Sequence, residues 1–394
     1  WTVPDNLSST VKVRISDPDH HPETARAVSG NFKIIGSLTV PNPVSPAVWY
    51  KGESHDITWD ATGAITNVKI EYKTSLGGLY QTIVANSAGH SAGANQSYTW
   101  PSVADENSES CYVRVSDVNN YDDTYGVSPT AFSMRPKITV TAPAGGNVKV
   151  NETCAVSWTI GGSSKVNPVN VQYSTAGVGG PYTTVTVSPV TASDGAYSWT
   201  PVPAAALADN VYVRVVDSVN TNTAGLSSAF NIIGNIVLDS PNGGNTWQVG
   251  AAANQITWHK PGNAAIGNAN IYVDYGSGYD ATPIATVDTN SVSAWTWNPI
   301  PDHVSNSVKI KIADADNANC YDESDAVFAI TGSFAITAPL AGAILVTGDA
   351  DYTISWTTTG SGINNVKLEF YDGTSWADIA ANAPSSANGT YTWE

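Results

Sequence analysis

The sequence predicts an all-β protein made of antiparallel two-sheet sandwiches that are repeated in tandem. A Tyr-Thr-Trp strand at residues 98–100 and a Val-Arg-Val-Ser-Asp strand at residues 113–117 return along the chain with a period of roughly a hundred residues. Inside one period, apolar and polar residues alternate in short stretches that Pro, Gly and Asn turns separate. Thr, Val and Tyr are abundant, and they favour strands over helices.

The period divides the chain into complete and partial repeats. One tryptophan marks each period, at Trp100, Trp199, Trp297 and Trp393. We expect complete repeats at 37–136, 137–234 and 235–332, the C-terminal part of a repeat at 1–36, and the N-terminal part of another at 333–394. Each complete period is long enough to bury its own core. A single active site would not need so many copies of its scaffold.

About seven short strands are expected in the first complete repeat, the number typical of such sandwiches. Their inward-facing residues are, in order, Leu38 and Val40, Ile57 and Trp59, Val68 with Ile70 and Tyr72, a weaker stretch at 80–84, Tyr98 and Trp100, Cys111 with Val113 and Val115, and Phe132 with Met134. Prolines 41 and 43 end the first strand because proline cannot donate a ladder hydrogen bond. Alternation with a period of two places each set on one face of a sheet.

The later repeats keep the same inward-facing residues. Trp59 returns as Trp158, Trp258 and Trp356, and Phe132 matches Phe32, Phe230 and Phe328. Because these rings alternate with polar neighbours, we expect them in the core and not in a cofactor site. Cys111 and Cys154 are expected to be buried free thiols, since no cysteine returns from one repeat to the next.

The amino-acid composition limits which partners and which location can be expected for the protein. Lys and Arg number 17 against 34 Asp and Glu, so the net charge of −17 disfavours nucleic acid as a partner. No run of about eighteen apolar residues is present, and no membrane span is expected within the chain. The chain also has no start methionine and no leader. We interpret it as an excerpt of a longer exported protein whose secretion signal and anchor lie outside it.

The sequence contains no motif that predicts an enzyme. A Gly-x-Ser-x-Gly elbow, a phosphate loop and a dinucleotide fingerprint are all absent. The six histidines lack the spaced His or Cys partners that a zinc site requires. Neighbouring loop acids such as Asp122 and Asp123 lack the opposed placement that glycoside cleavage needs. We therefore expect a protein without catalytic residues.

Consecutive repeats are joined with almost no linker. Residues 32–38 pass from the last strand of one repeat into the first strand of the next, and residues 134–138, 232–236 and 330–334 do the same. Such a connection leaves little room for hinge motion, unlike a Gly/Ser-rich tether. We expect a stiff rod, with four repeats in line reaching on the order of 100 Å or more from the rise of the strands.

The third complete repeat carries a recognisable motif. It opens with Ser-Pro-Asn-Gly-Gly-Asn-Thr-Trp-Gln-Val-Gly at 240–250 and continues with Gln-Ile-Thr-Trp at 255–258. Together with the Tyr-Thr-Trp and Val-Arg-Val-Ser-Asp strands that return along the chain, this motif resembles the immunoglobulin-like repeat of the Kre9/Knh-type, Ser-Thr-rich cell-wall proteins. Similar tandem repeats occur in large exported bacterial surface proteins. The openings at 41–43, 143–146 and 339–342 depart from the motif.

The resemblance implies an immunoglobulin-like fold and an extracellular structural or adhesive module at the cell surface. It transfers no catalytic residue to this chain. The Cys…Trp…Cys pattern of antibody domains is absent, so the sandwich is expected to lack that disulfide.

Acidic loops suggest a calcium site. The loop after the strand at 310–314 places Asp314, Asp316, Asp322 and Asp325 close together in sequence. Ca²⁺ takes six to eight oxygen ligands, which clustered carboxylates and amides supply. The alternative is that the first aspartate caps its own turn while the others are solvated. The corresponding loop after Asp217 has lost most of its acids, which favours this alternative for the repeats as a set.

Several aromatic and asparagine side chains suggest contact with sugars. Trp376 is a candidate platform for a glycan, while Trp49, Trp247 and Trp295 also lie outside the strictly repeated positions. The alternative is that these rings close the ends of a sandwich or pack on the next repeat. Four Asn-x-Ser/Thr motifs are candidate N-glycosylation sites, at Asn6, Asn95, Asn151 and Asn388.

These observations favour a structural protein, a rigid tandem array that forms a cell-surface stalk, sheath or filament together with copies of itself. An adhesin or carbohydrate-binding array that recognises cell-surface glycans is the alternative, and a spacer of an exported enzyme is another. The partial repeats cannot bury their apolar faces alone. Either the chain continues on both sides, or the end of one copy is completed by the start of the next.

Overall fold

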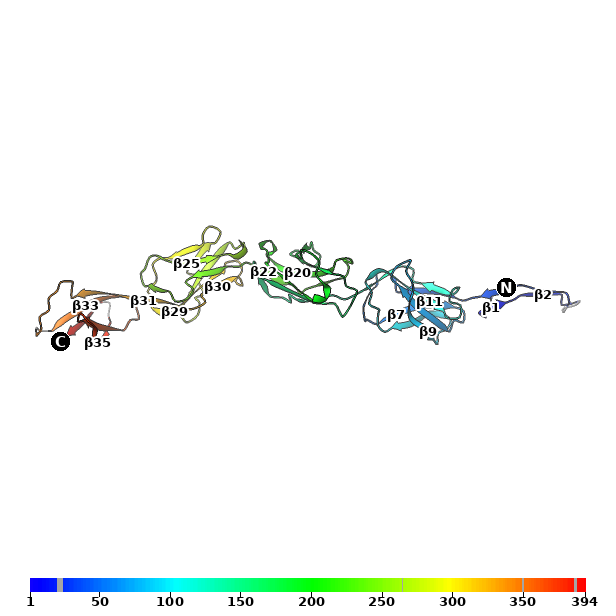
Figure 1. Cartoon of the computed structure of the whole chain (residues 1–394), viewed down its shortest axis with the longest axis horizontal. Coiled ribbons are helices and arrows are strands. Elements are labelled where there is room, and N and C mark those ends of the chain that lie inside the picture. The colour runs from blue at the N-terminus through cyan, green and yellow to red at the C-terminus, as the bar shows by residue number, and fades with distance from the viewer. Residues whose placement is uncertain (20–23, 264, 349–350, 386–387) are drawn as a thin grey trace. The chain divides into compact units, whose positions relative to one another are not determined.

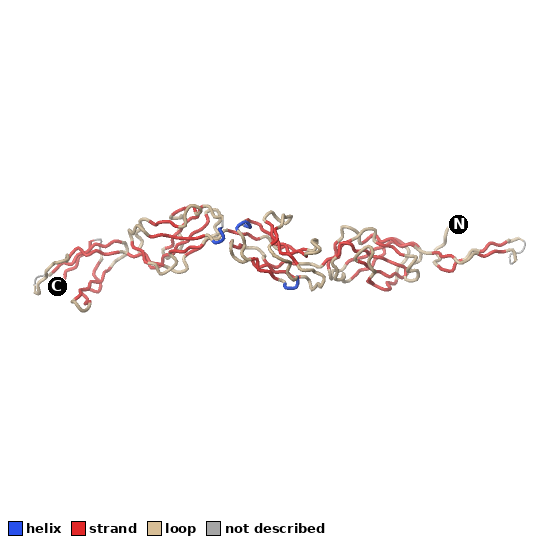
Figure 2. Tube along the Cα trace, turned by 45° about the horizontal axis from the view of Figure 1, so that its top comes forward, coloured by secondary structure: helices blue, strands red, loops and turns tan. Residues whose placement is uncertain are grey.

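The computed structural model describes residues 1–19, 24–263, 265–348, 351–385 and 388–394. Strands make up nearly all of its regular structure, as Figure 2 shows. Within these residues, the helical elements are three short 3-10 turns, η1 (Ala192–Asp194), η2 (Ala204–Ala206) and η3 (Pro261–Asn263). The chain divides into two compact units. One holds residues 1–144, 155–198 and 212–229, and the other holds residues 145–154, 199–211 and 230–394.

Residues 37–136 form a sandwich of two sheets, in which β7, β9 and β11 are labelled in Figure 1. The smaller sheet has the order β10-β7-β5, and the larger has the order β6-β13-β11-β8-β9, with β12 also paired to β11. The bounds are β5 (Ser37–Asn42), β6 (Val48–Tyr50), β7 (His55–Thr62), β8 (Asn67–Lys73), β9 (Gln81–Ala88), β10 (Gly93–Trp100), β11 (Ser108–Asp117), β12 (Tyr125–Val127) and β13 (Phe132–Arg135).

The next repeat has the same strand order, β14-β16-β19 in one sheet and β15-β22-β20-β17-β18 in the other, with β21 paired to β20. The bounds are β14 (Thr139–Ala142), β15 (Asn147–Lys149), β16 (Cys154–Thr159), β17 (Val169–Ser174), β18 (Thr183–Thr184), β19 (Ala196–Trp199), β20 (Ala208–Asp217), β21 (Ala224–Leu226) and β22 (Phe230–Ile233). The boundary between the two compact units passes through this repeat.

The third repeat again has the orders β23-β25-β28 and β24-β31-β29-β26-β27, with β30 paired to β29. The bounds are β23 (Val237–Ser240), β24 (Thr246–Gln248), β25 (Asn254–His259), β26 (Asn268–Asp274), β27 (Ala285–Asp288), β28 (Ala294–Trp297), β29 (Ser305–Asp314), β30 (Tyr321–Glu323) and β31 (Phe328–Thr331). The all-β fold and its immunoglobulin-like sandwiches in tandem are therefore confirmed.

Both ends of the described chain hold parts of the same sheets. At the start, β1 (Ser8–Val11) pairs with β4 (Phe32–Ile34), and β2 (Arg14–Ser16) pairs with β3 (Arg26–Val28). At the end, the sheet β32-β33-β36 is complete, but the other sheet holds only β34 and β35. Their bounds are β32 (Ser333–Ala338), β33 (Tyr352–Thr359), β34 (Asn365–Tyr371), β35 (Trp376–Pro384) and β36 (Asn388–Trp393).

One pairing in each complete repeat departs from the expected antiparallel pattern. Strand β6 runs parallel to β13, with Trp49 opposite Met134, and β15 and β24 pair in the same way. Trp49 is only 4% exposed, and its ring lies 4.8 Å from that of Phe132. The chain therefore leaves the small sheet after β5 and joins the edge of the large one, which carries Trp49 and Trp247 into the core.

The core consists of the inward-facing residues that alternation predicts. In 37–136, Ile57, Trp59 and Val113 are fully buried within one contiguous cluster. Burial of this size is the dominant stabilising term, at roughly 25 cal/mol for each Å² of apolar surface. All three cysteines are buried free thiols, and burial raises the pKa of each thiol to about 11. The expectation for Cys111 and Cys154 is confirmed.

A close backbone approach joins the two sheets of the first two complete sandwiches. A Cβ atom placed on Gly126 in β12 would lie 2.6 Å from the carbonyl oxygen of Leu38 in β5, so the position needs glycine. Gly225 occupies the same position opposite β20. The third repeat has Asp322 there instead, and its carboxylate accepts a hydrogen bond from the Leu238 N–H at 2.8 Å. A carboxylate thus replaces the direct backbone contact.

Gly126→Ala should destabilise the 37–136 sandwich by about 1–3 kcal/mol, because the new methyl group overlaps a backbone carbonyl that cannot move alone. Hydrogen exchange of the β11 amides measures the opening free energy. Gly77→Ala is the control, since its Cβ would meet open space. Equal protection in the two variants would contradict the close approach.

Candidate functional site at the repeat junctions

The junctions between successive repeats carry side chains that return along the chain outside the cores. The sequence motif Val-Arg-Val-Ser-Asp and its variants end in Asp17, Asp117, Asp217 and Asp314. Twelve residues before these aspartates stand Asp5, Asp105, Ala205 and Asp302, in that order. We call Asp5, Asp105 and Asp302 the junction aspartates. Each accepts hydrogen bonds from the turn that follows β7, β16 or β33 in the following repeat, as detailed below. Each junction described here lies within one compact unit.

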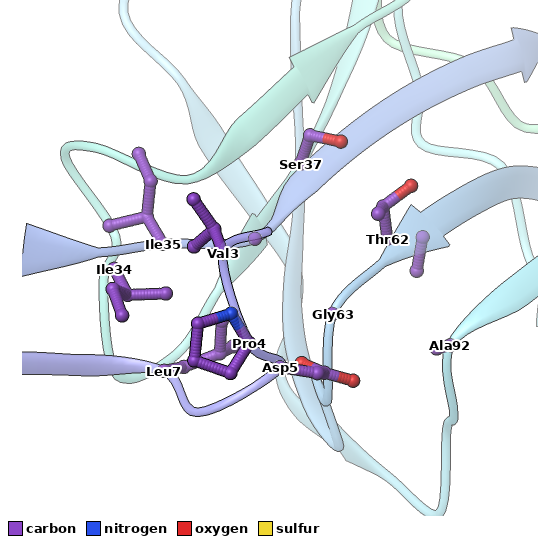
Figure 3. Close-up of a pocket in the computed structure, with 12 residues that line it drawn as sticks. Val3, Pro4, Asp5, Leu7, Ile34, Ile35, Ser37, Thr62, Gly63 and Ala92 are labelled. Carbon is purple, nitrogen blue, oxygen red and sulfur yellow. The ribbon is translucent and has the colours of Figure 1, made fainter. Parts of the chain in front are cut away.

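The junction between residues 1–36 and the 37–136 sandwich is shown in Figure 3. The Asp5 carboxylate lies beside Gly63 and accepts a hydrogen bond from the Ala64 N–H at 2.8 Å. Leu7 packs against the core cluster of the sandwich. Gly63 has a φ of +93°, and a Cβ there would lie 3.3 Å from the Asp5 carboxylate. A turn that requires glycine therefore brings the two segments into contact.

The junction between 37–136 and the start of the second repeat is the most polar. Asp105 accepts hydrogen bonds from the Ser163 hydroxyl at 2.5 Å and from the Ser164 N–H at 2.8 Å. Lys51 lies 3.7 Å from the same carboxylate and donates to the Gly162 carbonyl at 2.6 Å. Burial opposes ionisation of Asp105, but the serine hydrogen bonds and the lysine charge outweigh it and hold the pKa of the carboxyl below its usual value.

A buried aspartate organises the other side of this junction. Asp217 is fully buried and accepts hydrogen bonds from the Asn167 N–H at 2.8 Å and from the Asn107 side chain at 3.0 Å. The side-chain oxygen Oδ1 of Asn107 accepts in turn from the side chains of Asn220 and Thr223, both at 2.7 Å. Asn107 therefore bridges the strand that follows Asp105 to the loop that follows Asp217.

Glu109 extends the same network. It pairs with Arg135 through both carboxylate oxygens and accepts a hydrogen bond from Asn220 at 2.8 Å. The Arg135 guanidinium, with help from Asn220 and Ser133, lowers the pKa of Glu109 from 4.5 to about 2. The carboxylate is charged at neutral pH, and its bonds are charge-assisted. Glu109 thus binds Arg135 of its own repeat and Asn220 of the next repeat.

The linker residue itself differs between junctions. Gly36, Gly234 and Gly332 occupy the same position, four residues after the last phenylalanine of a repeat, and Pro136 holds it in the polar junction. A Cβ on Gly36 would lie 2.6 Å from the Thr62 carbonyl, and one on Gly234 would lie 2.7 Å from Ile266. The glycine is required because an isoleucine of the next repeat covers it. In the repeat that follows Pro136, Val166 holds the sequence position of that isoleucine.

The remaining junctions lie in the second compact unit. Asp302 accepts a hydrogen bond from the Ser361 N–H at 2.5 Å. At the junction with Ala205 in place of aspartate, the Asn235 side chain donates to the Val150 carbonyl at 2.9 Å, and Lys149 donates to the Tyr321 carbonyl at 3.3 Å. Different side chains therefore make the contact where the aspartate is missing.

The structure does not gather the four predicted calcium ligands. Asp314 accepts a hydrogen bond from the Asp316 N–H, as a turn-capping aspartate does, and burial raises the pKa of its carboxyl. Asp322 is bonded to Leu238, and Asp325 exchanges hydrogen bonds with the Asn242 side chain. Among the described residues, no three His, Cys, Asp or Glu side chains are grouped to hold a metal ion. The calcium site stays a prediction.

Trp376 lies at an aromatic position that returns in every repeat. It is 67% exposed and its ring lies tilted beside that of Tyr371, with ring centroids 5.3 Å apart. The strand registers match it to three tyrosines, Tyr80, Tyr182 and Tyr279. Each of these rings lies under a cation from β11, β20 or β29, two strands away in the sheet, with Arg114 at 5.4 Å, Arg214 at 4.0 Å and Lys311 at 4.6 Å. We call the tyrosine and the cation over its ring, in each repeat, the cation–aromatic clasp.

The sequence analysis missed the clasp, although its signal was present. Arg114, Arg214 and Lys311 hold one position of the repeated Val-Arg-Val-Ser-Asp strand, while the aromatic partner lies before a strand of variable length.

Of the predicted glycosylation sites, Asn6, Asn95 and Asn151 are exposed, and Asn151 lies against the turn of the next repeat at Gly262. Asn388 begins β36. Trp295 is half-buried, with its ring 6.4 Å from that of Trp297.

No protein-family model matches the chain, and no curated protein matches it. A tetra-tandem repeat in the extending region of a large adhesion protein is 17% identical, with 91% of this chain and 90% of that chain covered and a TM-score of 0.27. Extracellular domains 3–5 of Drosophila OTK are 10% identical over 74% of this chain and 95% of that one, with a TM-score of 0.26.

The N-terminal four Ig domains of Dscam1 isoform 6.9 are 10% identical over 77% of this chain and 76% of that one, with a TM-score of 0.22. By their own descriptions, the first of these three structures is a tandem repeat of an adhesion protein, the second holds extracellular domains and the third holds Ig domains. None points to the Kre9/Knh-type repeat in particular, and that resemblance stays a prediction. Within the described residues, no helix has the length and apolar character that crossing a membrane requires.

Replacing Asn107 by leucine, the residue found at the equivalent positions 7 and 207, should weaken the polar junction by about 1–3 kcal/mol. Asp217, Asn220 and Thr223 each lose a buried hydrogen-bond partner. Hydrogen exchange of the Val219 and Asn220 amides, which donate to Asp217, measures the change. The exposed Asn119→Leu is the control. Unchanged exchange in Asn107→Leu would contradict the bridging role.

Proposed function

We propose that the chain is a non-enzymatic extracellular structural protein, an array of immunoglobulin-like repeats that acts as a stiff cell-surface stalk, sheath or filament. The observation that carries this proposal is the side-chain contact at each junction, above all the Asp105 and Asn107 hydrogen bonds to the next repeat. Repeats that needed only to be connected would not require these hydrogen bonds, because a flexible linker would connect them. Several such bonds acting on one short linker restrict its rotation.

The acidic composition is compatible with an extracellular location. A net charge of −17 keeps neighbouring arrays soluble and disfavours polyanionic partners. Tandem repeats of this class also form part of the proteins described above as adhesive or extracellular. The array provides length and spacing, and the side-chain contacts between repeats restrict the rotation of its linkers.

An adhesin that binds glycans is the second candidate, and exposed aromatic rings favour it. Tyr125 and Tyr321 are 48% and 45% exposed beside the clasp cations Arg114 and Lys311. Aromatic faces of this kind stack on sugar rings. Binding to a glycan array that is lost in Tyr125→Ala and Tyr321→Ala would favour this candidate over a purely structural array.

A distance measurement between the first two complete repeats tests stiffness. Spin labels on cysteines introduced at the exposed Leu79 and Val187 should give a narrow distance distribution by double electron–electron resonance. The native thiols stay unlabelled because they are buried. The double variant Asp105→Ala/Asn107→Ala should broaden the distribution, since the junction hydrogen bonds are gone, whereas exposed Asp122→Ala should not. An equally broad distribution in all three proteins would refute a stiff array.

A further inference from the structure

The outer face of the large sheet in residues 37–136 carries side chains that neither the core nor the junctions use. The strand registers place Arg114 of β11 opposite Glu71 of β8, and Tyr112 opposite Lys73. Alternation turns these four side chains away from the core, because Val113 between them in β11 is fully buried. This outer face lies within one complete repeat and within one compact unit.

Arg114 lies at the centre of the outer face. Three tyrosine rings surround its guanidinium, with the ring centroid of Tyr121 at 4.1 Å, that of Tyr125 at 4.3 Å and that of Tyr80 at 5.4 Å. The guanidinium donates hydrogen bonds to the Ser116 hydroxyl at 3.0 Å and to the Tyr121 carbonyl at 2.6 Å. Both acceptors are neutral, and an arginine has five N–H donors. These contacts hold the guanidinium in place and leave donors for a ligand.

Lys73 is a second cation on the outer face. Its ammonium lies 4.9 Å from the ring centroid of Tyr80 and 5.7 Å from that of Tyr112. Because Lys73 stands two residues beyond Glu71, the cross-strand partner of Arg114, the two cations are diagonal neighbours on adjacent strands. Positions related in this way lie about 7–8 Å apart. Two anionic groups of one polymer can therefore each meet a cation.

These two cations are not neutralised by an ion pair within the repeat. The other Lys and Arg residues of the repeat, Lys51, Lys69 and Arg135, each form an ion pair with a carboxylate. Within the part of the chain that the structure describes, Lys73 and Arg114 form none. Acids are plentiful in the sequence, with 34 Asp and Glu against 17 Lys and Arg. Cations that meet only neutral groups in such a chain are available to an anion from outside it.

Glu71 is the acidic side chain among these residues, and its charge is already satisfied. Only 3% of it is exposed, and its carboxylate accepts a hydrogen bond from the Tyr121 hydroxyl at 2.7 Å and pairs with Lys69 at 2.6 Å. The buried carboxylate thus fixes the Tyr121 ring beside Arg114. Tyr125, on the other side of the guanidinium, is 48% exposed. A ligand therefore meets cations next to an exposed aromatic ring.

The second complete repeat lacks this combination. Arg214 holds the position of Arg114, but it donates two hydrogen bonds to the Gln172 side chain, at 3.0 and 2.6 Å. The register places Ala224 where the first repeat has Tyr125. The second repeat therefore has the cation without the exposed ring, and it serves as an internal control.

The third complete repeat differs in its charge. Lys311 holds the position of Arg114, and Glu323 of β30 stands opposite it, where Val127 of β12 stands opposite Arg114. A carboxylate beside the cation competes with an anion from outside, which an apolar neighbour does not do. The arrangement that suits an anionic ligand is therefore the one in residues 37–136.

We propose that the outer face of the large sheet in residues 37–136 binds a glycan whose sugar rings carry carboxylate groups, a uronic-acid polymer. Arg114 binds one carboxylate through the paired N–H groups of its planar fork, and Lys73 binds a second as a point charge. The exposed Tyr125 ring stacks on the apolar face of a sugar. Although the chain carries a net charge of −17, its distant acids are screened beyond about 8 Å at physiological ionic strength, so the charges on the outer face decide the contact.

This inference rests on the glycan-binding candidate described above and gives that candidate a site and a class of ligand. Binding of a neutral glycan at another surface would keep the candidate and overturn this site. The stiffness of the array depends on the junctions, so the distance measurement between repeats is independent of both.

Isothermal titration of the full 394-residue chain with hexasaccharides of galacturonate, mannuronate and guluronate tests the proposal. At least one of the three should bind at a single site, and its affinity should fall as the salt concentration rises, because the contact is between charges. A wild-type chain that binds none of these hexasaccharides would overturn the proposal.

Substitutions locate the site. Arg114→Gln and Lys73→Gln should each weaken binding by roughly tenfold to a hundredfold, the range for the loss of one hydrogen bond to a charged group. Arg214→Gln, the matched change in the second repeat, should bind as wild type does. Lys73→Gln keeps the test valid if Arg114→Gln lowers the Tm, because Lys73 lies only partly buried and outside any ion pair of the described residues. Unchanged affinity in Lys73→Gln, or equal losses in Arg114→Gln and Arg214→Gln, would overturn the assigned site.

Matched probes test the class of ligand. The methyl ester of the hexasaccharide that binds keeps the sugar rings and removes their charge, so it should bind at least tenfold more weakly. A hexaglutamate peptide carries the same number of carboxylates without sugar rings, and it should also bind more weakly because nothing stacks on Tyr125. Equal affinity for the ester would overturn the role of the carboxylates. Equal affinity for the peptide would overturn the assignment to a glycan, and equal affinity for a sulfated hexasaccharide would overturn the assignment to carboxylate groups.

Discussion

The hydrogen bond from the turn of one repeat to a carboxylate of the preceding repeat is the contact on which the array depends. It occurs at Asp5, Asp105 and Asp302, each time to a backbone N–H. A hydrogen bond to a charged group contributes about 1.5–3 kcal/mol, more than a neutral one. The contact acts on a linker of very few residues, and chain connectivity alone would leave that linker free to rotate.

The residues around this contact are apolar where the linker is glycine and polar where it is proline. Where the linker is glycine, an isoleucine covers it and Leu7, Leu207 or Val304 provides an apolar neighbour. Where the linker is Pro136, Asn107 replaces the apolar residue and bonds to the buried Asp217. A satisfied polar network selects one arrangement of its members, because any other arrangement leaves buried groups unpaired. The polar junction therefore specifies orientation more strictly than an apolar contact of similar size.

Much of the fold follows from the sequence because strand alternation and core burial are local properties. Ile57, Trp59 and Val113 face inward as period-two alternation predicts. The parallel strand Val48–Tyr50 escaped prediction because three residues are too few to show alternation. Its pairing with β13 depends on a partner far along the chain.

The junction site could not be predicted from sequence in the same way. Asn107 and Asp217 stand 110 residues apart, and nothing in either local sequence indicates that they meet. Acidic loops were instead grouped by proximity in sequence, which placed Asp322 and Asp325 in one candidate metal site. The structure gives each a different partner, Leu238 and Asn242. Proximity along a loop says little about where carboxylates point.

Residual dipolar couplings of the backbone amides in residues 37–136 and 137–234, measured in the full chain, test most directly whether junction contacts hold successive repeats in one orientation. The account predicts that one alignment tensor fits both sets of couplings. Two tensors of different magnitude, one for each repeat, would show that the repeats reorient independently and would contradict it.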